Sequence, residues 1–307
     1  MNRREALATL ASGLLLPSLR TSAESASPHQ LPAPHIATNT YPWSTFARRE
    51  QVPYTRHSEA LLKRIASTGI NGYEPIIESP TELQGLASRL ATHGLEMRSI
   101  YVNSSLHDST QSARSIDSVL AICNELAAFG TKIVVTNPSP IRWGGPEDKD
   151  DQQLAHQAES LDALGSQLRK LGLTLAYHNH DAELRQGARE FHHMLTATSS
   201  ENVKFCLDSH WIFRGCGDSQ IALFDAVEHY QDRIVELHLR QSFQGIWTEA
   251  FSMKGDIDYS RLFRHLRDAD IQPHLVLEQA VEDGSPDKLG ATQAHRQGRQ
   301  KLLRAIT

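Results

Sequence analysis

One feature of the sequence limits the fold more than any other: from residue 36 onward, short apolar runs alternate with helical segments eight times. The runs, each of strand length, are Ile36–Trp43, Gly72–Glu78, Glu96–Val102, Lys132–Asn137, Leu173–His180, Val203–His210, Ile234–Arg240 and His274–Ala280. Apolar residues recur at helical spacing over 58–68, 80–93, 112–129, 151–171, 188–198, 219–231, 258–269 and 287–305. This alternation predicts strand–helix units that build a parallel sheet.

Four of the predicted helices end at a glycine directly before the next strand, namely Gly69, Gly94, Gly130 and Gly172. A glycine at this position adopts the left-handed conformation that closes a helix. Eight such units over about 250 residues predict an α/β fold, a single (β/α)8 TIM barrel over 36–307. The competing architecture, an open doubly wound sheet, usually carries a Gly-rich fingerprint after its first strand, and none follows here.

The N-terminus has the composition of a targeting segment. The arginine pair Arg3-Arg4 precedes an apolar stretch over 6–16, which is too short to span a bilayer. The segment 1–23 resembles a twin-arginine (Tat) export signal, and the Pro/Ser-rich segment 24–35 is typical of a linker. We therefore expect a periplasmic or exported protein without stable membrane insertion after export. A basic helix on a cytoplasmic protein is the alternative.

Charge and cysteine content exclude several classes of protein. Lys and Arg number 31 and Asp and Glu 36, so the formal net charge is −5, which disfavours nucleic-acid binding through a basic surface. Loss of 1–23 would remove three Arg and one Glu and leave a net charge of −7. The three cysteines have no metal-type spacing and cannot form a disulfide framework. The 16 histidines direct attention to metal or acid–base chemistry.

Potential metal ligands gather at the ends of the last four predicted strands. Strand period two places large apolar residues on one face of each strand and polar residues on the other. The polar set is His178, His180, Asp208, His210, Glu236, His238, Arg240 and Glu278. Because chemistry in a barrel occurs at the carboxyl ends of its strands, we expect this set to face the barrel mouth.

Four of these residues form a set suited to one divalent metal ion: His178, Asp208, His238 and Glu278. Two imidazoles and two carboxylates are ligands that transition metals accept, and they leave positions for water or substrate oxygens. Burying so many titratable groups without a metal would cost several kcal/mol each unless all were paired. A hydrogen-bonded network without metal is the alternative.

Five motifs on the expected strands resemble one branch of the xylose isomerase-like TIM barrels, the sugar phosphate isomerase/epimerase proteins. They are Tyr177-His178-Asn179-His180-Asp181 followed by Glu183, Leu207-Asp208-Ser209-His210-Trp211, Leu237-His238-Leu239, Gly255-Asp256-Ile257-Asp258-Tyr259 and Val276-Leu277-Glu278-Gln279. The resemblance covers about 36–305. It implies a divalent cation (Mn2+, Zn2+ or Co2+), a polyhydroxylated substrate and proton transfer next to a carbonyl. It assigns Asp208, His238 and Glu278 as ligands.

The sequence departs from the resemblance on strand five. Epimerases of the wider superfamily place a Glu where this chain has His178, so the usual pair of opposed carboxylates is incomplete. We expect a metal-dependent sugar isomerase or epimerase. The alternative is a lyase or hydratase acting on 3-keto-glycosides or inosose-like substrates. The missing carboxylate gives this alternative slight support.

Further residues are candidates for catalysis and substrate binding. The predicted proton-transfer residues are His180 or Glu278, with His210 and Glu183 in reserve. The predicted substrate contacts are Arg240, Lys254, Trp211 and Glu74. The predicted partner is a small carbohydrate without phosphate, since phosphorylated sugars are scarce outside the cytoplasm and no phosphate loop is present. The protein could also form a homo-oligomer. Two alternative functions are a non-catalytic sugar-binding barrel and an apurinic endonuclease, and the negative net charge argues against the endonuclease.

Overall fold

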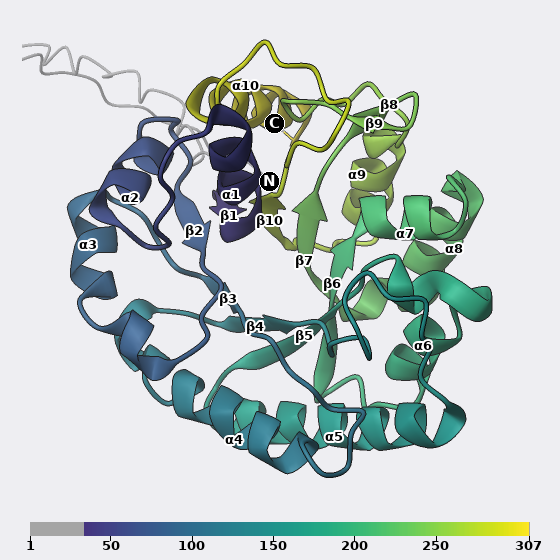
Figure 1. Cartoon of the computed structure of the whole chain (residues 1–307). Coiled ribbons are helices and arrows are strands. Elements are labelled where there is room, and N and C mark those ends of the chain that lie inside the picture. Colours follow the sequence, from purple (N-terminus) through teal and green to yellow (C-terminus); the bar gives the residue numbers. More distant parts are fainter. Residues whose placement is uncertain (1–33, 307) are drawn as a thin grey trace, which may run out of the picture. The chain divides into compact units, whose positions relative to one another are not determined.

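The computed structural model describes residues 34–306, which form one compact unit. Eight parallel strands form its centre (Figure 1). They are β1 Ile36–Asn39, β2 Gly72–Glu74, β3 Ser99–Tyr101, β4 Ile133–Thr136, β5 Thr174–His178, β6 Val203–Asp208, β7 Ile234–Leu239 and β10 His274–Leu277. The predicted export signal and most of the predicted linker lie outside the described residues.

The strands close on themselves. Their order in the sheet is β2-β1-β10-β7-β6-β5-β4-β3. The two end strands, β2 and β3, are joined by isolated parallel bridges and by backbone hydrogen bonds from Tyr73 N to Glu96 O and from Ile77 N to Tyr101 O, both 2.9 Å. The predicted single (β/α)8 barrel is therefore confirmed.

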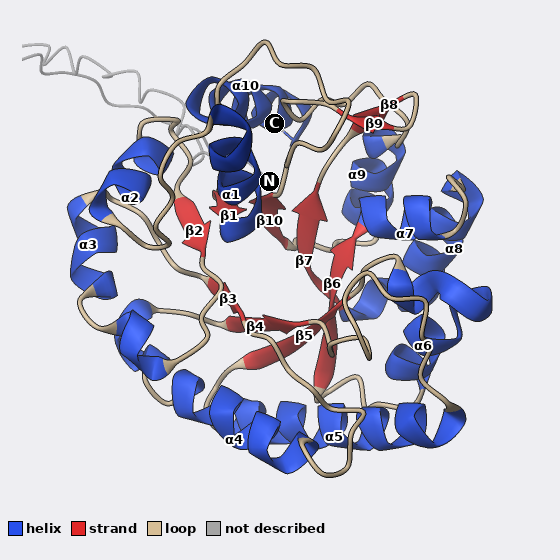
Figure 2. Ribbon diagram, viewed as in Figure 1, coloured by secondary structure: helices blue, strands red, loops and turns tan. Residues whose placement is uncertain are grey.

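Helices surround the strands on the outside (Figure 2). They are α1 Thr40–Glu50, α2 Glu59–Ala66, α3 Leu86–Thr92, α4 Ser112–Cys123, α5 Asp151–Lys170, α6 Arg185–Thr196, α7 Ser209–Gly215, α8 Gln220–Tyr230, α9 Tyr259–Asp268 and α10 Ala291–Ile306. Short 3-10 turns are η1 Pro80–Leu83, η2 Leu126–Phe129, η3 Ala182–Leu184 and η4 Gln231–Arg233. A small hairpin of β8 Ser242–Phe243 and β9 Ile246–Trp247 follows β7. None of the helices within 34–306 is long and apolar enough to cross a membrane.

Two helices begin where the sequence predicted that strands continue. The first strand ends at Asn39, and α1 starts at Thr40 with a proline in its first turn. The sixth ends at Asp208, because this carboxylate accepts hydrogen bonds from His210 N (3.0 Å) and Trp211 N (2.9 Å) and so caps α7. Both helices start at the barrel mouth and bring aromatic residues to it.

The predicted division of each strand into two faces is confirmed. The side chains that face the helices, such as Tyr177, Phe205 and Leu237, belong to the main hydrophobic core. Ala176 and Cys206 belong to a second, small apolar cluster with Val135. All of these side chains are buried, so β5 and β6 each contribute to two separate interiors.

Candidate metal centre and substrate pocket

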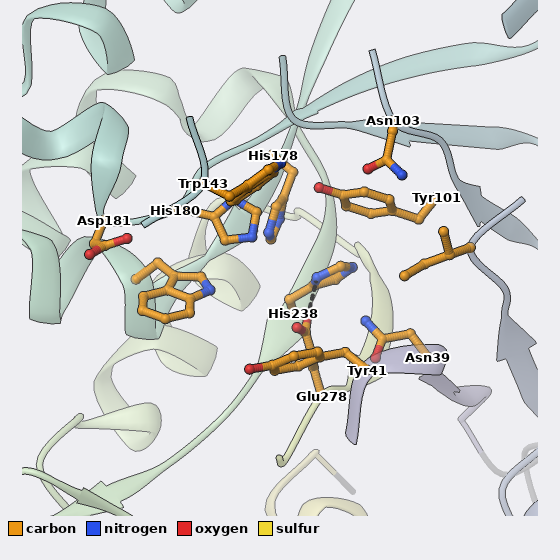
Figure 3. A pocket seen from close by; sticks show the side chains of 12 residues that line it. Asn39, Tyr41, Tyr101, Asn103, Trp143, His178, His180, Asp181, His238 and Glu278 are labelled. Atoms are coloured by element: carbon orange, nitrogen blue, oxygen red, sulfur yellow. Dashed lines mark ion pairs between the residues drawn. The ribbon is translucent and has the colours of Figure 1, made fainter. Parts of the chain in front are cut away.

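A cavity of about 360 Å3 opens at the carboxyl ends of the strands, within the range of small-molecule sites (Figure 3). Its lining residues are Asn39, Tyr41, Ile76, Tyr101, Asn103, Trp143, His178, His180, Asp181, Trp211, His238 and Glu278. Four of them, Asn39, Tyr101, His178 and Glu278, end a strand or directly follow one, which is where barrel enzymes hold their reacting groups.

Three predicted ligands converge in this region. One ligand atom each from Asp208, His238 and Glu278 lies within 4.8 Å of the other two, and all three residues are buried. Parallel pairing brings them together, because Asp208 lies opposite His238 and Glu278 directly follows β10, the strand paired with β7 on its other side.

The donor atoms of this group are suited to a cation. His238 Nδ1 and Glu278 Oε2 are 2.5 Å apart, as Figure 3 shows, yet neither atom makes a hydrogen bond of normal geometry. Asp208 Oδ2 likewise has no hydrogen-bond partner among the described residues. One imidazole and two carboxylates with unpartnered, converging atoms fit the divalent cation that the family resemblance implies.

The fourth predicted ligand, His178, lies beside this group. Its ring centroid is 4.7 Å from that of His238, and it forms a separate potential donor group with His238 and Cys206. Its Nδ1 has no hydrogen-bond partner within the described chain. Burial and the neighbouring His238 lower the pKa of His178 well below its ordinary value, so its ring is neutral and able to bind a metal.

Arg240 holds Glu278 instead of lining the pocket. The buried guanidinium donates from Nη2 to Glu278 Oε1 (2.6 Å) and from Nε to the Glu278 carbonyl (3.0 Å). It lies 4.2 Å from the Trp247 ring and 5.1 Å from the Trp211 ring. Burial alone would raise the pKa of Glu278, but Arg240 and His238 outweigh burial and lower it, so this carboxylate is ionised.

His180 lies in the pocket, between two tryptophans. It meets Trp143 at a centroid distance of 5.2 Å and Trp211 at 5.7 Å, and its Nδ1 is unpartnered among the described residues. Burial lowers the pKa of His180 to about 4, so the ring is neutral near pH 7. Trp211 lines the cavity, as the sequence predicted.

Glu183 supports the same segment from behind the pocket wall. Its Oε2 accepts a hydrogen bond from His180 N at 2.6 Å. Burial raises the pKa of Glu183 to about 7. It does not line the cavity, so the structure places this predicted reserve base one layer behind His180.

Two further predicted site residues, His210 and Lys254, do not line the cavity. His210, on α7, is fully buried against Phe213, Trp211 and Trp247, and neither ring nitrogen has a hydrogen-bond partner among the described residues. Burial lowers the pKa of His210 to about 2. Lys254 is exposed and lines a separate hollow beside the β8–β9 hairpin. Sequence position alone placed them near the mouth, but the capped turn of α7 and the hairpin direct them elsewhere.

Glu74, predicted as a substrate contact, lies beneath the pocket. Its Oε1 is 3.2 Å from His238 Nε2, and it accepts hydrogen bonds from Asn39 Nδ2 (3.3 Å) and Ser99 Oγ (3.0 Å). It is inaccessible to solvent, so it contacts the predicted ligand His238 and not the pocket space.

The first half of the barrel contributes a wall of the cavity that the sequence did not predict. Asn39 ends β1, Tyr101 ends β3 and Asn103 follows it, and all three line the cavity together with Tyr41 of α1. Their position at the ends of predicted strands could have identified them as pocket residues. However, asparagine and tyrosine are not the His, Asp and Glu ligands by which the site was recognised on the later strands.

The motif Gly255-Asp256-Ile257-Asp258-Tyr259 shapes the mouth from outside. A Cβ on Gly255 would lie 2.3 Å from both Gln241 Cδ and Ser242 O, so only glycine permits this close approach. Asp256 accepts hydrogen bonds from Ser242 Oγ and from the amides of Gln244 and Gly245, which fixes the β8–β9 hairpin.

The chain belongs to the xylose isomerase-like TIM barrel family, whose model matches residues 62–304. It is 24% identical over 252 residues to an inosose dehydratase of Clostridium perfringens, covering 72% of this chain and 81% of that protein.

Two solved structures share the fold. One is a sugar phosphate isomerase/epimerase from Parabacteroides distasonis, with a TM-score of 0.69 at 15% identity, covering 94% of this chain and 98% of that chain. The other is an L-ribulose 3-epimerase, with a TM-score of 0.65 at 17% identity, covering 88% of this chain and 94% of that chain. Together with the family match, these relatives confirm the predicted class, an enzyme of the xylose isomerase-like barrel type.

Proposed function

We propose that this protein is a metal-dependent enzyme that removes the proton next to the carbonyl of an unphosphorylated keto-sugar. The observation that carries the proposal is the convergence of Asp208, His238 and Glu278 within 4.8 Å, beside a sugar-sized cavity that His238 and Glu278 line. The chain is similar to epimerases and to a dehydratase, enzymes whose names fit chemistry beside a carbonyl.

Asp208, His238 and Glu278 would hold the cation, with His178 as the adjoining imidazole. When bound, a divalent cation supplies a Lewis acid that polarises a ketone oxygen. The residues of the chain supply the remaining functions: orientation of the substrate, exclusion of water and proton transfer.

Two groups are in position to move the proton. Glu278 and His180 come from different strands and face the same cavity (Figure 3). Arg240 keeps Glu278 ionised, and burial keeps His180 neutral, so each can accept a proton near pH 7. Each can then return a proton to the substrate from its own side of the cavity.

The pocket favours a neutral substrate. Among residues 34–306, no Lys or Arg lines the cavity, whereas enzymes that bind phosphate present cationic side chains or backbone amide cradles. Asn39 and Asn103 offer amides for hydroxyl groups, and Tyr41, Trp143 and Trp211 offer flat faces for a sugar ring.

Elimination is the second candidate outcome. The cavity wall at β5 presents His178 and His180, and in the part of the chain that the structure describes the acidic residues that line the cavity are Glu278 and the exposed Asp181. In place of a second buried carboxylate facing Glu278, the cavity offers the neutral imidazole of His180. His180 could take the proton from carbon and pass it to the oxygen of a hydroxyl or alkoxyl group β to the carbonyl, which then leaves as water or an alcohol and gives dehydration or lyase chemistry.

Incubation with Mn2+ and a panel of keto-sugars, inososes and 3-keto-glycosides in deuterated water tests the proposal. We expect deuterium beside the carbonyl in the product for isomerisation or epimerisation, and an unsaturated product for elimination, both visible by NMR. Turnover of none of these substrates, by a chain shown to bind Mn2+, would contradict the proposal.

We also propose that the protein works outside the cytoplasm, on the basis of the arginine pair and apolar stretch at its N-terminus. Fractionation of cells that express the full chain tests this proposal. Removal of residues 1–23 together with appearance in the periplasm is expected, and retention of the full-length chain in the cytoplasm would contradict it.

A further inference from the structure

Beneath the proposed metal centre lies a pair of buried carboxyl groups that proton transfer does not use. Glu74 ends β2, and Glu236 lies on β7, two residues before His238 and on the same face of the strand. Neither side chain is accessible to solvent. Two carboxyl groups in a closed interior require a compensating role, because buried acidic groups are costly unless they are paired.

Both carboxyl groups meet at the same atom of the same ring. Glu74 Oε1 and Glu236 Oε1 each lie 3.2 Å from His238 Nε2. The opposite nitrogen, Nδ1, lies 2.5 Å from Glu278 Oε2, on the side of the proposed cation. The two nitrogens of His238 thus face two different sets of carboxyl oxygens.

The two carboxyl groups hold the ring from different parts of the barrel. Glu74 is fixed by Asn39 of β1 and Ser99 of β3, which donate to its two oxygens. Glu236 reaches the ring from the same strand and contacts Cys206 Sγ at 3.7 Å. Acceptors on two sides oppose rotation of the imidazole more effectively than one would.

We propose that Glu74 and Glu236 are positioning residues that hold His238 with its proton on Nε2 and so present the lone pair of Nδ1 to the cation. Both ring nitrogens face carboxyl oxygens, but a cation bound at Nδ1 would use the lone pair of that nitrogen, so the single proton of the neutral ring would then lie on Nε2, where Glu74 and Glu236 accept it. A histidine that binds a metal commonly donates its other N–H to a carboxylate, which fixes both tautomer and orientation. The inference rests on the proposed function, since it assigns these residues to the proposed cation.

The test compares two substitutions at Glu236 in the full chain. Glu236→Leu removes the acceptor and should weaken Mn2+ binding about 10–100-fold, the usual loss when a carboxylate behind a metal-binding histidine is removed. Glu236→Gln retains an acceptor oxygen and should lose clearly less. Glu74→Leu should behave as Glu236→Leu does. The matched control is Glu249→Gln. Glu249 is a buried glutamate that pairs with Arg49 and lies outside the cavity, so this variant should bind Mn2+ as the wild type does.

A second measurement tests the same inference without substrate. Nitrogen-15 NMR of the chain loaded with diamagnetic Zn2+ should show His238 with its proton on Nε2 in the wild type, and Glu236→Leu should lose this single, fixed form of the ring. A wild-type ring protonated on Nδ1, or Leu variants that bind Mn2+ as tightly as the wild type, would overturn the inference. A wild type that binds Mn2+ but turns over no keto-sugar would overturn the proposed function and leave this inference standing.

Discussion

The outward and inward faces of the same strands differ sharply in chemistry. On β5, Tyr177 faces the helices and packs in the main core, whereas its neighbour His178 faces the pocket. On β6, Leu207 faces outward, whereas Asp208 joins the proposed metal group. Both faces are buried to a similar extent, so burial alone does not distinguish them.

The outward apolar side chains stabilise the barrel, whereas the inward polar side chains form the proposed site that the barrel holds in place. Apolar side chains on the outward face stabilise the fold by roughly 1.5–3 kcal/mol each when fully buried. The polar groups on the inward face include several atoms without hydrogen-bond partners among the described residues, which opposes folding. Their presence is therefore best explained by function, and substitutions on the two faces should have opposite signatures.

The largest effect should follow a change on the inward face. Glu278→Gln removes the ionised carboxylate that we place both at the cation and among the proton-transfer groups. Activity should fall about 10²–10⁴-fold, the usual contribution of a positioned acid or base, in steady-state kinetics with the keto-sugar found by the NMR assay. Circular dichroism should confirm that the variant folds despite the loss of a partner for Arg240. A folded variant with full activity would show that Glu278 has no role in the reaction.

A change on the outward face should affect stability and not the site. Phe205→Ala removes a fully buried ring between β6 and the helices and should lower the free energy of unfolding by about 3–5 kcal/mol. Urea unfolding followed by circular dichroism measures the loss. Under conditions where the variant is folded, its Mn2+ affinity should equal that of the wild type. Loss of Mn2+ binding in the folded variant would mean that the two faces are not independent.

A buried histidine on the outside of the barrel should make stability depend on pH. His295 of α10 stacks on Trp43 at 4.3 Å, and burial lowers its pKa to about 4. Its contribution is complete above pH 6.5, where the unfolded chain is also neutral, and is lost as the pH falls towards 4, because only the unfolded state then binds the proton.

The lost stability from this residue amounts to about 3 kcal/mol between pH 6.5 and 4. His295→Phe keeps a stacked ring without a titrating group, so its unfolding free energy should decline less than that of the wild type over this range. Chemical denaturation at a series of pH values makes the comparison. Parallel curves for the two proteins would refute the assignment.

The smallest effect should come from the rim of the pocket. Trp143 lines the cavity but is 56% exposed, so it contributes a substrate contact and little stability. Trp143→Ala should raise KM about 2–10-fold, the value of one aromatic contact, with kcat nearly unchanged. Phe243→Ala, at a hairpin residue 59% exposed and outside the cavity, is the matched control. Equal effects of the two substitutions would remove Trp143 from the substrate site.

The sequence predicted the barrel well because its signals are local and repeated. Gly69, Gly94, Gly130 and Gly172 all have positive φ in the structure, as closing glycines require. Strand period two placed Asp208, His238 and Glu278 on one face, and the parallel register then brought their side chains together. The predicted first and sixth strands were too long because apolar runs do not reveal where a helix starts: α1 begins with a proline in its first turn, and Asp208 caps α7.

Interactions across the barrel could not be predicted in the same way. The ion pair of Arg240 with Glu278 and the contact of Glu74 with His238 join residues 38 or more positions apart. Arg240 and Glu74 therefore seemed suited to the substrate, although burial assigns them to neighbouring side chains. Tyr101 and Asn103 were missed because their role depends on the closure of the barrel between β2 and β3.

The most direct test of the account is a crystal of the chain soaked with Mn2+ and measured for anomalous scattering. The account predicts one strong peak bound by Asp208, His238 through Nδ1 and Glu278, with His178 beside it. A peak elsewhere, or no peak in a crystal where these side chains are well ordered, would contradict it.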